Sequence, residues 1–286
     1  MSRQHNEPLN TPVVQAFGLK RMPFPQELPT RDLFELRTVA NVASMVEFSV
    51  NCSMFFALIG EVGCGKTSSL RYACDKIPDA ATRKISIVAG IWNFTEMLRQ
   101  LLSELHIEFK PYQPSVMIRL IQEQLLTTQQ EGRKALLVID EAHLLKPDAY
   151  AQLHILAQHA NAKGPLLSLV LCGQEELSDK LNAPAARPLA SRISEGYYIP
   201  SLVQDDFELY IEHHLKLAGA PHDLFSDLAK GTIWQAGNGN LRSIGRTCLA
   251  ALQLAANRQL SQVTPDCVRE VTKGWWADSV KPHSLE

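Results

Sequence analysis

The segment that most constrains the fold of this chain is a glycine-rich loop between an apolar run and a helical run. Residues 60–67 read GEVGCGKT and match the pattern G-x-x-x-x-G-K-[ST] at every defined position. The apolar run MFFALIG before the loop predicts a buried strand, and residues 68–76 after it predict a helix. A strand, this loop and a helix in that order predict a phosphate-binding loop, whereas a chance glycine-rich turn would need neither neighbour.

Each residue type in this segment has a physical role. The glycines let backbone N–H groups turn toward phosphate oxygens, and the helix N-terminus adds a partial positive charge. Lys66 is expected to reach the β- and γ-phosphates, and the Thr67 hydroxyl is expected to bind magnesium. ATP and Mg2+ are therefore the predicted cofactors. The residues of this segment predicted to bind nucleotide are Gly60, Glu61, Val62, Gly63, Cys64, Gly65, Lys66, Thr67 and Ser68.

A second motif, LLVIDE at residues 136–141, ends in two carboxylates. A carboxylate at the end of a buried strand is costly unless it holds a metal or a proton. Asp140 is therefore predicted to bind magnesium, directly or through water, and Glu141 to orient and deprotonate the attacking water. His143 follows directly. It is expected either to hydrogen-bond near the site or to lie exposed at a helix start.

The remaining pattern predicts an α/β fold with two parts. Apolar runs at residues 84–89, 135–140 and 166–173 join the first strand in a parallel sheet covered by helices on both faces. After Pro200 the pattern predicts only helices. The fold class is thus a P-loop parallel-sheet αβα core followed by a C-terminal all-helical lid domain. The expected divisions are an extended, proline-rich N-terminal arm at 1–30, the core at 31–200 and the lid at 201–286.

Composition excludes several other classes of protein. Among 286 residues, 45% are hydrophobic and 20% are charged, a globular balance that argues against disorder or a fibrous chain. A net charge of -2 argues against coating nucleic acid by bulk charge, although a small basic patch stays possible. No apolar run approaches the roughly 20 residues of a spanning helix, so no membrane partner is expected. Six scattered cysteines without a C-x-x-C pair suggest reduced thiols and a cytoplasmic location.

Three further polar residues are candidates for the phosphate site. No guanine-reading N-K-x-D is present, and a helical domain after the core favours ATP hydrolysis coupled to lid movement over a small-molecule kinase. Gln174, after the fourth strand, is placed to touch the γ-phosphate or the water, or is an ordinary strand-end amide. Arg242 lies in a first helical turn, which the helix dipole disfavours, so a phosphate partner is one explanation and simple solvation another. Arg192, with Arg187 as runner-up, is a candidate arginine finger or a surface arginine, and a finger would require an oligomer.

Taken in order, these segments resemble AAA+ ATPases of the ExeA/TnsC/MuB-like group, which contains transposition-associated and secretion-associated P-loop ATPases. GEVGCGKT and LLVIDEAHLL resemble its Walker motifs, LCGQEEL its sensor 1 strand, LASRI its finger segment and GNGNLRSIGR its sensor 2 helix. The segment FGLKRMPF at residues 17–24 resembles the group's N-terminal element. That resemblance implies that Pro23 and Phe24 lie near the adenine.

The resemblance implies a function as well. It implies an ATP-binding and hydrolysing regulator that binds double-stranded DNA as a homo-oligomeric ring or filament, selects target DNA and stimulates a DDE transposase. One alternative is a secretion or envelope accessory ATPase of the ExeA type. The similar secretion members carry a membrane span and a wall-binding domain after the core, which are not expected here because the sequence stops shortly after Trp275 and Trp276. Another alternative is a nucleotide-switched assembly module with very slow turnover.

The sequence offers one candidate surface for DNA. No Asp or Glu occurs from Leu228 to Pro265, and this stretch holds four basic residues: Lys230, Arg242, Arg246 and Arg258. Four such charges would neutralise a few phosphates, although an ordinary lid surface is the alternative. Lysines of the core are other candidates: Lys146, Lys163 and Lys180. Trp275 and Trp276 would either dock a partner or close the lid core.

Overall fold

The computed structural model describes residues 11–108 and 113–273 and divides into two compact units. Residues 35–200 form one unit, called the core here. Residues 11–34 join residues 201–273 in the other, called the helical unit. Within the described residues, no helix is both long enough and apolar enough to span a membrane.

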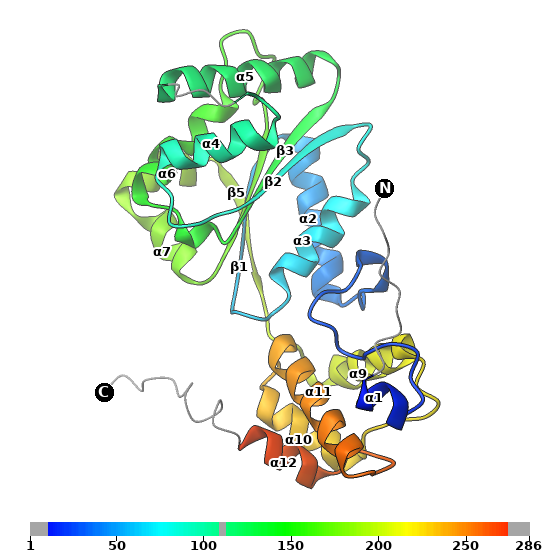
Figure 1. Ribbon diagram of the computed structural model, residues 1–286. Coiled ribbons are helices and arrows are strands. Elements are labelled where there is room, and N and C mark those ends of the chain that lie inside the picture. The colour runs from blue at the N-terminus through cyan, green and yellow to red at the C-terminus, as the bar shows by residue number, and fades with distance from the viewer. Residues whose placement is uncertain (1–10, 109–112, 274–286) are drawn as a thin grey trace, which may run out of the picture. The chain divides into compact units, whose positions relative to one another are not determined.

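The core is built on one parallel sheet of five strands in the order β2-β3-β4-β1-β5 (Figure 1). Its strands are β1 Phe55–Gly60, β2 Thr82–Val88, β3 Lys134–Asp140, β4 Ser168–Gly173 and β5 Ile193–Ile199. Four of them lie in the predicted apolar runs, which confirms the predicted fold class. β5 was not predicted. It is an edge strand, and most of its residues are exposed, so it carries no apolar run.

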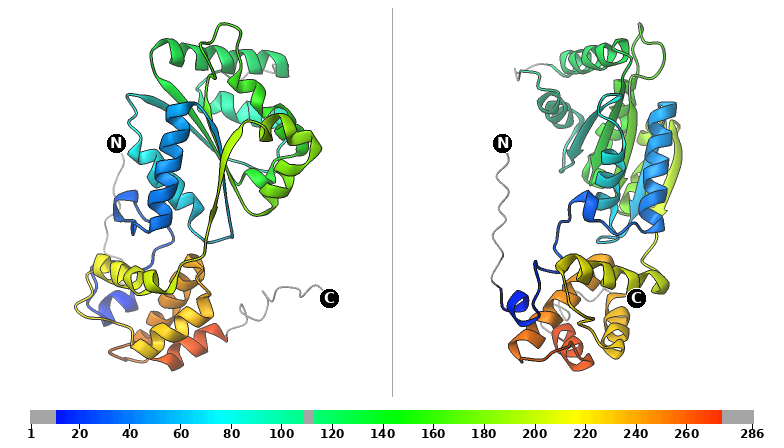
Figure 2. Two further views of the ribbon diagram at one scale, coloured as in Figure 1. Left: turned by 180° about the vertical axis from the view of Figure 1, so that it is seen from behind. Right: turned by 90° about the vertical axis from the view of Figure 1, so that its right-hand side faces the viewer.

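Alternating side chains of the strands build a hydrophobic layer on each face of the sheet. Phe55 and Ala57 of β1 point into the layer shared with α4, α5 and α6, whereas Phe56 and Leu58 point into the layer shared with α2 and α3. The two groups of helices lie on opposite faces of the sheet (Figures 1 and 2). The helices are α2 Arg37–Cys52, α3 Lys66–Lys76, α4 Phe94–Glu104, α5 Pro114–Gln130, α6 Pro147–Gln152, α7 Glu176–Asn182 and α8 Arg187–Ala190. Short 3-10 helices are η2 Ala142–Leu144, η3 Leu153–Ala157 and η4 Pro184–Ala186.

Helix α4 shows how local sequence and packing agree. Asn93 caps it by accepting from the Glu96 N–H at 2.9 Å, while the Glu96 carboxylate accepts from the Asn93 N–H at 2.7 Å. The apolar residues recur at helical spacing, and all of them are buried: Phe94, Met97, Leu98, Leu101, Leu102 and Leu105. The stripe therefore fastens α4 to its face of the sheet.

The helical unit contains α1 Pro12–Ala16, η1 Thr30–Asp32, α9 Gln204–Ala218, α10 Asp227–Gly237, α11 Leu241–Asn257 and α12 Pro265–Thr272. The last three helices pack on one another, and α1 packs on α11. Residues 11–34 thus differ from the extended arm expected from their prolines. Val13, Phe17, Leu19 and Phe24 are buried, and the Lys20 N–H donates to the carbonyl of Ala218 at 2.8 Å. These contacts hold the segment against the lid helices.

Candidate nucleotide-binding site

The glycine-rich loop lies between β1 and α3, as its motif requires. Gly63 and Gly65 have φ angles of 83° and 97°, which side chains with a Cβ rarely adopt. A Cβ on Gly60 would lie 2.8 Å from Cys64 Sγ and 3.2 Å from the Ile199 carbonyl oxygen. All three glycines are therefore required by the backbone path of the loop.

Lys66 begins α3 and is only 6% exposed. Its Nζ donates to the carbonyl oxygens of Gly60 and Glu61, both at 2.7 Å. These contacts hold the ammonium group inside the loop that it closes. A phosphate would be a stronger, charged acceptor for the same group.

The two motifs meet through Thr67 and Asp140. Thr67 Oγ1 donates to Asp140 Oδ2 at 2.7 Å, across a separation of 73 residues. Asp140 ends β3 and is buried, and its Oδ1 accepts from the Glu141 N–H at 2.9 Å. A hydroxyl and a carboxylate are oxygen ligands of the kind that magnesium prefers. Within residues 11–108 and 113–273, no group of three or more His, Cys, Asp or Glu could hold a metal ion.

Two side chains that the motifs did not indicate adjoin this centre. The thiol of Cys172, on β4, hydrogen-bonds the Asp140 carboxylate, and burial, then that carboxylate, raises the pKa of the thiol far above its usual range. The thiol therefore stays protonated as a donor. Tyr198 OH, on β5, donates to Glu175 Oε1 at 2.8 Å, and this bond, then burial, raises the pKa of Tyr198 to about 12. Neither residue has a sequence signal, because their partners depend on the strand order.

Residues 52–181 match the family described as the AAA domain. CDC6P from Pyrobaculum aerophilum matches the fold with a TM-score of 0.68 at 20% identity, over 87% of this chain and 68% of that chain. The chain has the P-loop AAA+ fold. Its parallel sheet, loop and C-terminal helices have the arrangement expected of that fold.

Two further comparisons each cover most of this chain. General secretion pathway protein A of Aeromonas hydrophila is 30% identical over 250 residues, which cover 85% of this chain. This chain spans only 45% of that protein's length. The Aeropyrum pernix ORC1 protein in complex with DNA matches with a TM-score of 0.61 at 14% identity, over 86% of this chain and 65% of that chain.

Gln174 lies directly after β4, between the strands that carry the two motifs. Its backbone N–H donates to His143 Nδ1 at 3.4 Å. His143 is buried rather than exposed at a helix start, and its Nδ1 lies 3.6 Å from Glu141 Oε2. Gln174, His143 and Glu141 thus gather at the carboxyl edge of the sheet, beside the phosphate-binding loop of the AAA+ domain.

Arg192 and Arg187 are both exposed, and Arg192 lies at the amino ends of the strands, opposite the phosphate-binding loop. Arg192 comes directly before β5, whose first residue pairs with Phe55 at the start of β1. The phosphate-binding loop follows Gly60 at the end of β1, so strand geometry separates it from Arg192 by about 20 Å. Arg192 Nη1 donates to the Pro188 carbonyl. The candidate finger is therefore remote from the loop of its own core.

The other predicted nucleotide-binding residues belong to the helical unit. Arg242 is exposed in the first turn of α11, where Asn240 caps the helix by accepting from the Ser243 N–H at 3.0 Å. Phe24 is 4% exposed with a φ of 52°, and its ring is surrounded by Tyr210, His214 and Phe225. Its ring thus belongs to the interior of this unit. The roles of Pro23, Phe24 and Arg242 toward nucleotide stay predictions.

Carboxylates neutralise part of the predicted basic surface. Lys230 pairs with Asp223, and Arg258 Nη2 donates to both carboxylate oxygens of Glu270 at 2.8 and 2.7 Å. Both carboxylates lie just outside the acid-free stretch. Arg242 and Arg246 are exposed and lie one turn apart on α11. Among the core lysines, Lys146 and Lys163 are exposed, while Lys180 Nζ donates to the carbonyls of His143 and Leu145. Trp275 and Trp276 lie outside the described residues.

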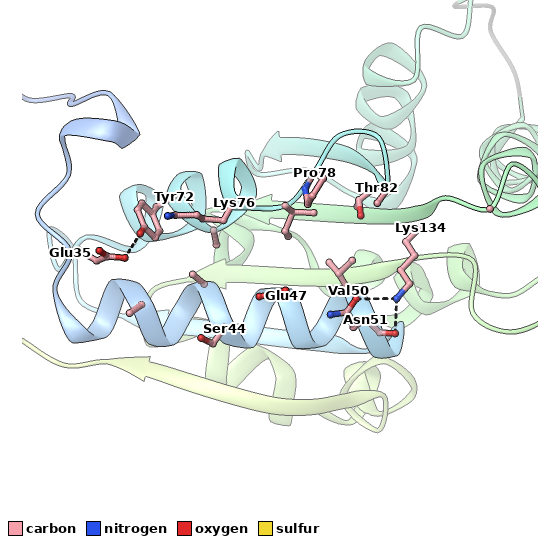
Figure 3. A pocket seen from close by; sticks show the side chains of 16 residues that line it. Glu35, Ser44, Glu47, Val50, Asn51, Tyr72, Lys76, Pro78, Thr82 and Lys134 are labelled. Carbon is pink, nitrogen blue, oxygen red and sulfur yellow. Dashed lines mark hydrogen bonds between the residues drawn. The ribbon is translucent and has the colours of Figure 1, made fainter.

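A groove of about 410 Å³ between α2 and α3 is not part of this site (Figure 3). It opens near Thr82 and Lys134, at the amino ends of β2 and β3, away from the phosphate-binding loop. Its polar groups bond to one another. Lys134 Nζ donates to the backbone carbonyl of Asn51 at 2.8 Å, and Tyr72 donates to Glu35.

Proposed function

We propose that the chain is a magnesium-dependent ATPase whose nucleotide state controls an oligomer. The contact that carries this proposal is the hydrogen bond from Thr67 to Asp140 beside the buried Lys66 ammonium. Thr67 and Asp140 would hold Mg2+, which supplies positive charge to the phosphates when bound. Lys66 stabilises charge on the phosphates, and Glu141 orients and deprotonates the attacking water.

The position of Arg192 favours action between subunits. About 20 Å of strand separates it from its own loop, which is too far for a guanidinium to touch the γ-phosphate there. A finger at this edge would serve the nucleotide of a neighbouring copy. Arg242 would add positive charge to the phosphates, and Gln174 would touch the γ-phosphate or the water.

Glu141→Gln is the first test of the ATPase proposal. The variant should bind a nonhydrolysable ATP analogue as the wild type does and lose at least about 100-fold in turnover, because the amide cannot accept a proton. Glu104→Gln, which changes an exposed carboxylate at the end of α4, is the matched control. Unchanged turnover in Glu141→Gln would remove Glu141 from its role.

Mixed oligomers test the finger. Lys66→Ala subunits should lack nucleotide binding but offer an intact Arg192, whereas Arg192→Ala subunits should bind ATP but lack the finger. Mixing the two inactive preparations should restore part of the activity, and each preparation alone serves as the baseline. No recovery would leave Arg192 without support and would direct the same experiment to Arg187.

The cellular role has two candidates, both in the cytoplasm, where ATP is available. The 30% identity with General secretion pathway protein A favours an accessory ATPase of secretion. An ATP-dependent regulator that binds double-stranded DNA and stimulates a DDE transposase is the second candidate. It is favoured by the exposed pair Arg242 and Arg246, and a fold relative is known in complex with DNA.

Binding to duplex DNA separates the two roles. With a nonhydrolysable ATP analogue and magnesium at low salt, the DNA-binding role predicts a complex whose affinity falls steeply as salt rises. Arg246→Glu should weaken that complex, while Lys163→Glu, at an exposed core lysine, should change it less. Absence of any complex under these conditions would leave the secretion role. ATP-dependent assembly with negligible turnover and no DNA binding would instead favour a slow nucleotide-switched assembly module.

A further inference from the structure

One imidazole nitrogen of the core faces both the predicted catalytic glutamate and the sensor 1 loop. His143 is 9% exposed in η2. Its Nδ1 lies 3.4 Å from the backbone N–H nitrogen of Gln174 and 3.6 Å from Glu141 Oε2. The first distance is a long hydrogen bond, and the second is a few tenths of an ångström beyond one.

These two contacts require different forms of the ring. To accept from the Gln174 N–H, Nδ1 must carry its lone pair, with the ring proton on Nε2. To donate to the Glu141 carboxylate, Nδ1 must carry the proton instead. A neutral imidazole can satisfy one partner at a time. Moving between them transfers the ring proton from Nε2 to Nδ1 through solvent, with no net gain of a proton.

The surrounding backbone keeps His143 between its two partners. Lys180 Nζ donates to the carbonyls of His143 and Leu145, the latter at 2.9 Å, and so ties η2 to α7. A Cβ on Gly173 would lie 3.2 Å from the His143 backbone nitrogen, so the end of β4 is in close contact with this turn. Because the backbone is held on both sides, a change of partner from Gln174 to Glu141 would need only a small rotation of the ring and a change of tautomer.

We propose that His143 is a positioning residue that couples the Gln174 loop to Glu141. When Gln174 moves toward the γ-phosphate, its N–H leaves Nδ1, and the imidazole donates to one oxygen of Glu141. Fixing that oxygen orients the other toward the attacking water. The inference rests on the ATPase function proposed above, since it assigns His143 a role through Glu141.

The test compares single and double variants at saturating ATP. His143→Ala should lower kcat by about 10-fold, because Glu141 is no longer oriented, and should leave KM and the affinity for an ATP analogue within about two-fold. His143→Asn, whose amide offers both a donor and an acceptor near the position of Nδ1, should recover most of kcat. His159→Ala is the matched control, because His159 Nδ1 also accepts a backbone N–H, from Asn161 at 3.2 Å, but the ring has no ion pair with a carboxylate among the described residues.

A double-variant cycle separates positioning from simple support of the fold. If His143 acts through Glu141, adding His143→Ala to Glu141→Gln should cause no further loss of turnover. An unchanged kcat in His143→Ala, a rise in KM as large as the fall in kcat, or additive losses in the double variant would each overturn the inference. If Glu141→Gln alone keeps full turnover, the ATPase proposal fails first. If Glu141→Gln lowers turnover but His143→Ala does not, the inference about His143 is refuted and the ATPase proposal stands.

Discussion

Mild acid should destabilise the helical unit through one histidine. His214 on α9 is 4% exposed, its ring stacks on Phe24 with 4.8 Å between centroids, and its Nδ1 is buried with no hydrogen-bond partner among the described residues. Burial, then the positive charges of His213 and Arg21, lowers the pKa of His214 to about 4 from 6.5. The folded unit therefore favours the neutral ring.

The sign and size of the effect follow from the two pKa values. Because the folded pKa lies below the unfolded one, the contribution of His214 is complete above pH 6.5 and is lost as the pH falls toward 4. Between pH 7 and pH 5 the unfolded chain binds most of one additional proton. Linkage over this interval amounts to about 2 kcal/mol of lost stability.

Urea unfolding at pH 7 and pH 5, followed by circular dichroism, measures this loss. His214→Phe keeps an aromatic ring against Phe24 and removes the titrating nitrogen, so its free energy of unfolding should fall by about 2 kcal/mol less than that of the wild type. His222→Phe, at an exposed histidine of the same unit, should behave as the wild type does. Equal losses in the wild type and His214→Phe would refute the reasoning.

Three other predictions test the site and the surface. Gly60→Ala should lower the affinity for an ATP analogue by more than about 10-fold, since its Cβ meets Sγ of the loop cysteine at 2.8 Å, whereas Gly164→Ala, with open space around it, should not. Asp140→Asn should raise the magnesium concentration for half-maximal ATPase activity by about 10-fold or more, as measured by magnesium titration, because it removes a charged ligand; an unchanged titration would argue against Asp140 as a ligand. Breaking the exposed pair of Arg258 and Glu270 with Arg258→Ala should leave the midpoint of urea unfolding nearly unchanged, and a clear fall in the midpoint would mean that the pair supports the fold.

The core was predictable where each residue is fixed by its own neighbours in sequence. The phosphate-binding loop is specified by its glycines, and four strands by apolar runs. Three of these strands, β1, β3 and β4, are buried on both faces. β5 escaped prediction because an edge strand can remain exposed, as Tyr198 does. The contacts of Tyr198 with Glu175 and of Cys172 with Asp140 also depend on the strand order, which a local pattern does not specify.

The helical unit was less predictable because its contacts join distant segments. Prolines suggested an extended arm, but the apolar residues of that segment are spaced irregularly and still become buried when they meet the lid helices. An acid-free stretch suggested a basic surface, yet Asp223 and Glu270 approach it from outside and pair with Lys230 and Arg258. Net charge within a window of sequence therefore overestimated the charge that a phosphate backbone would meet.

The direction of the strands limits how Arg192 could act. Each core carries a phosphate-binding loop at the carboxyl end of β1 and Arg192 at the amino end of the neighbouring parallel strand β5. Parallel strands cannot bring these two ends together within one chain, because both strands run in the same direction from one end of the sheet to the other. If Arg192 contributes to hydrolysis, the contribution must therefore come from another copy, and turnover per chain should rise with protein concentration as copies assemble. If Arg192 is an ordinary surface arginine with no role in hydrolysis, turnover per chain should not depend on protein concentration. Measuring turnover against protein concentration is therefore the simplest test of whether the AAA+ domain works alone.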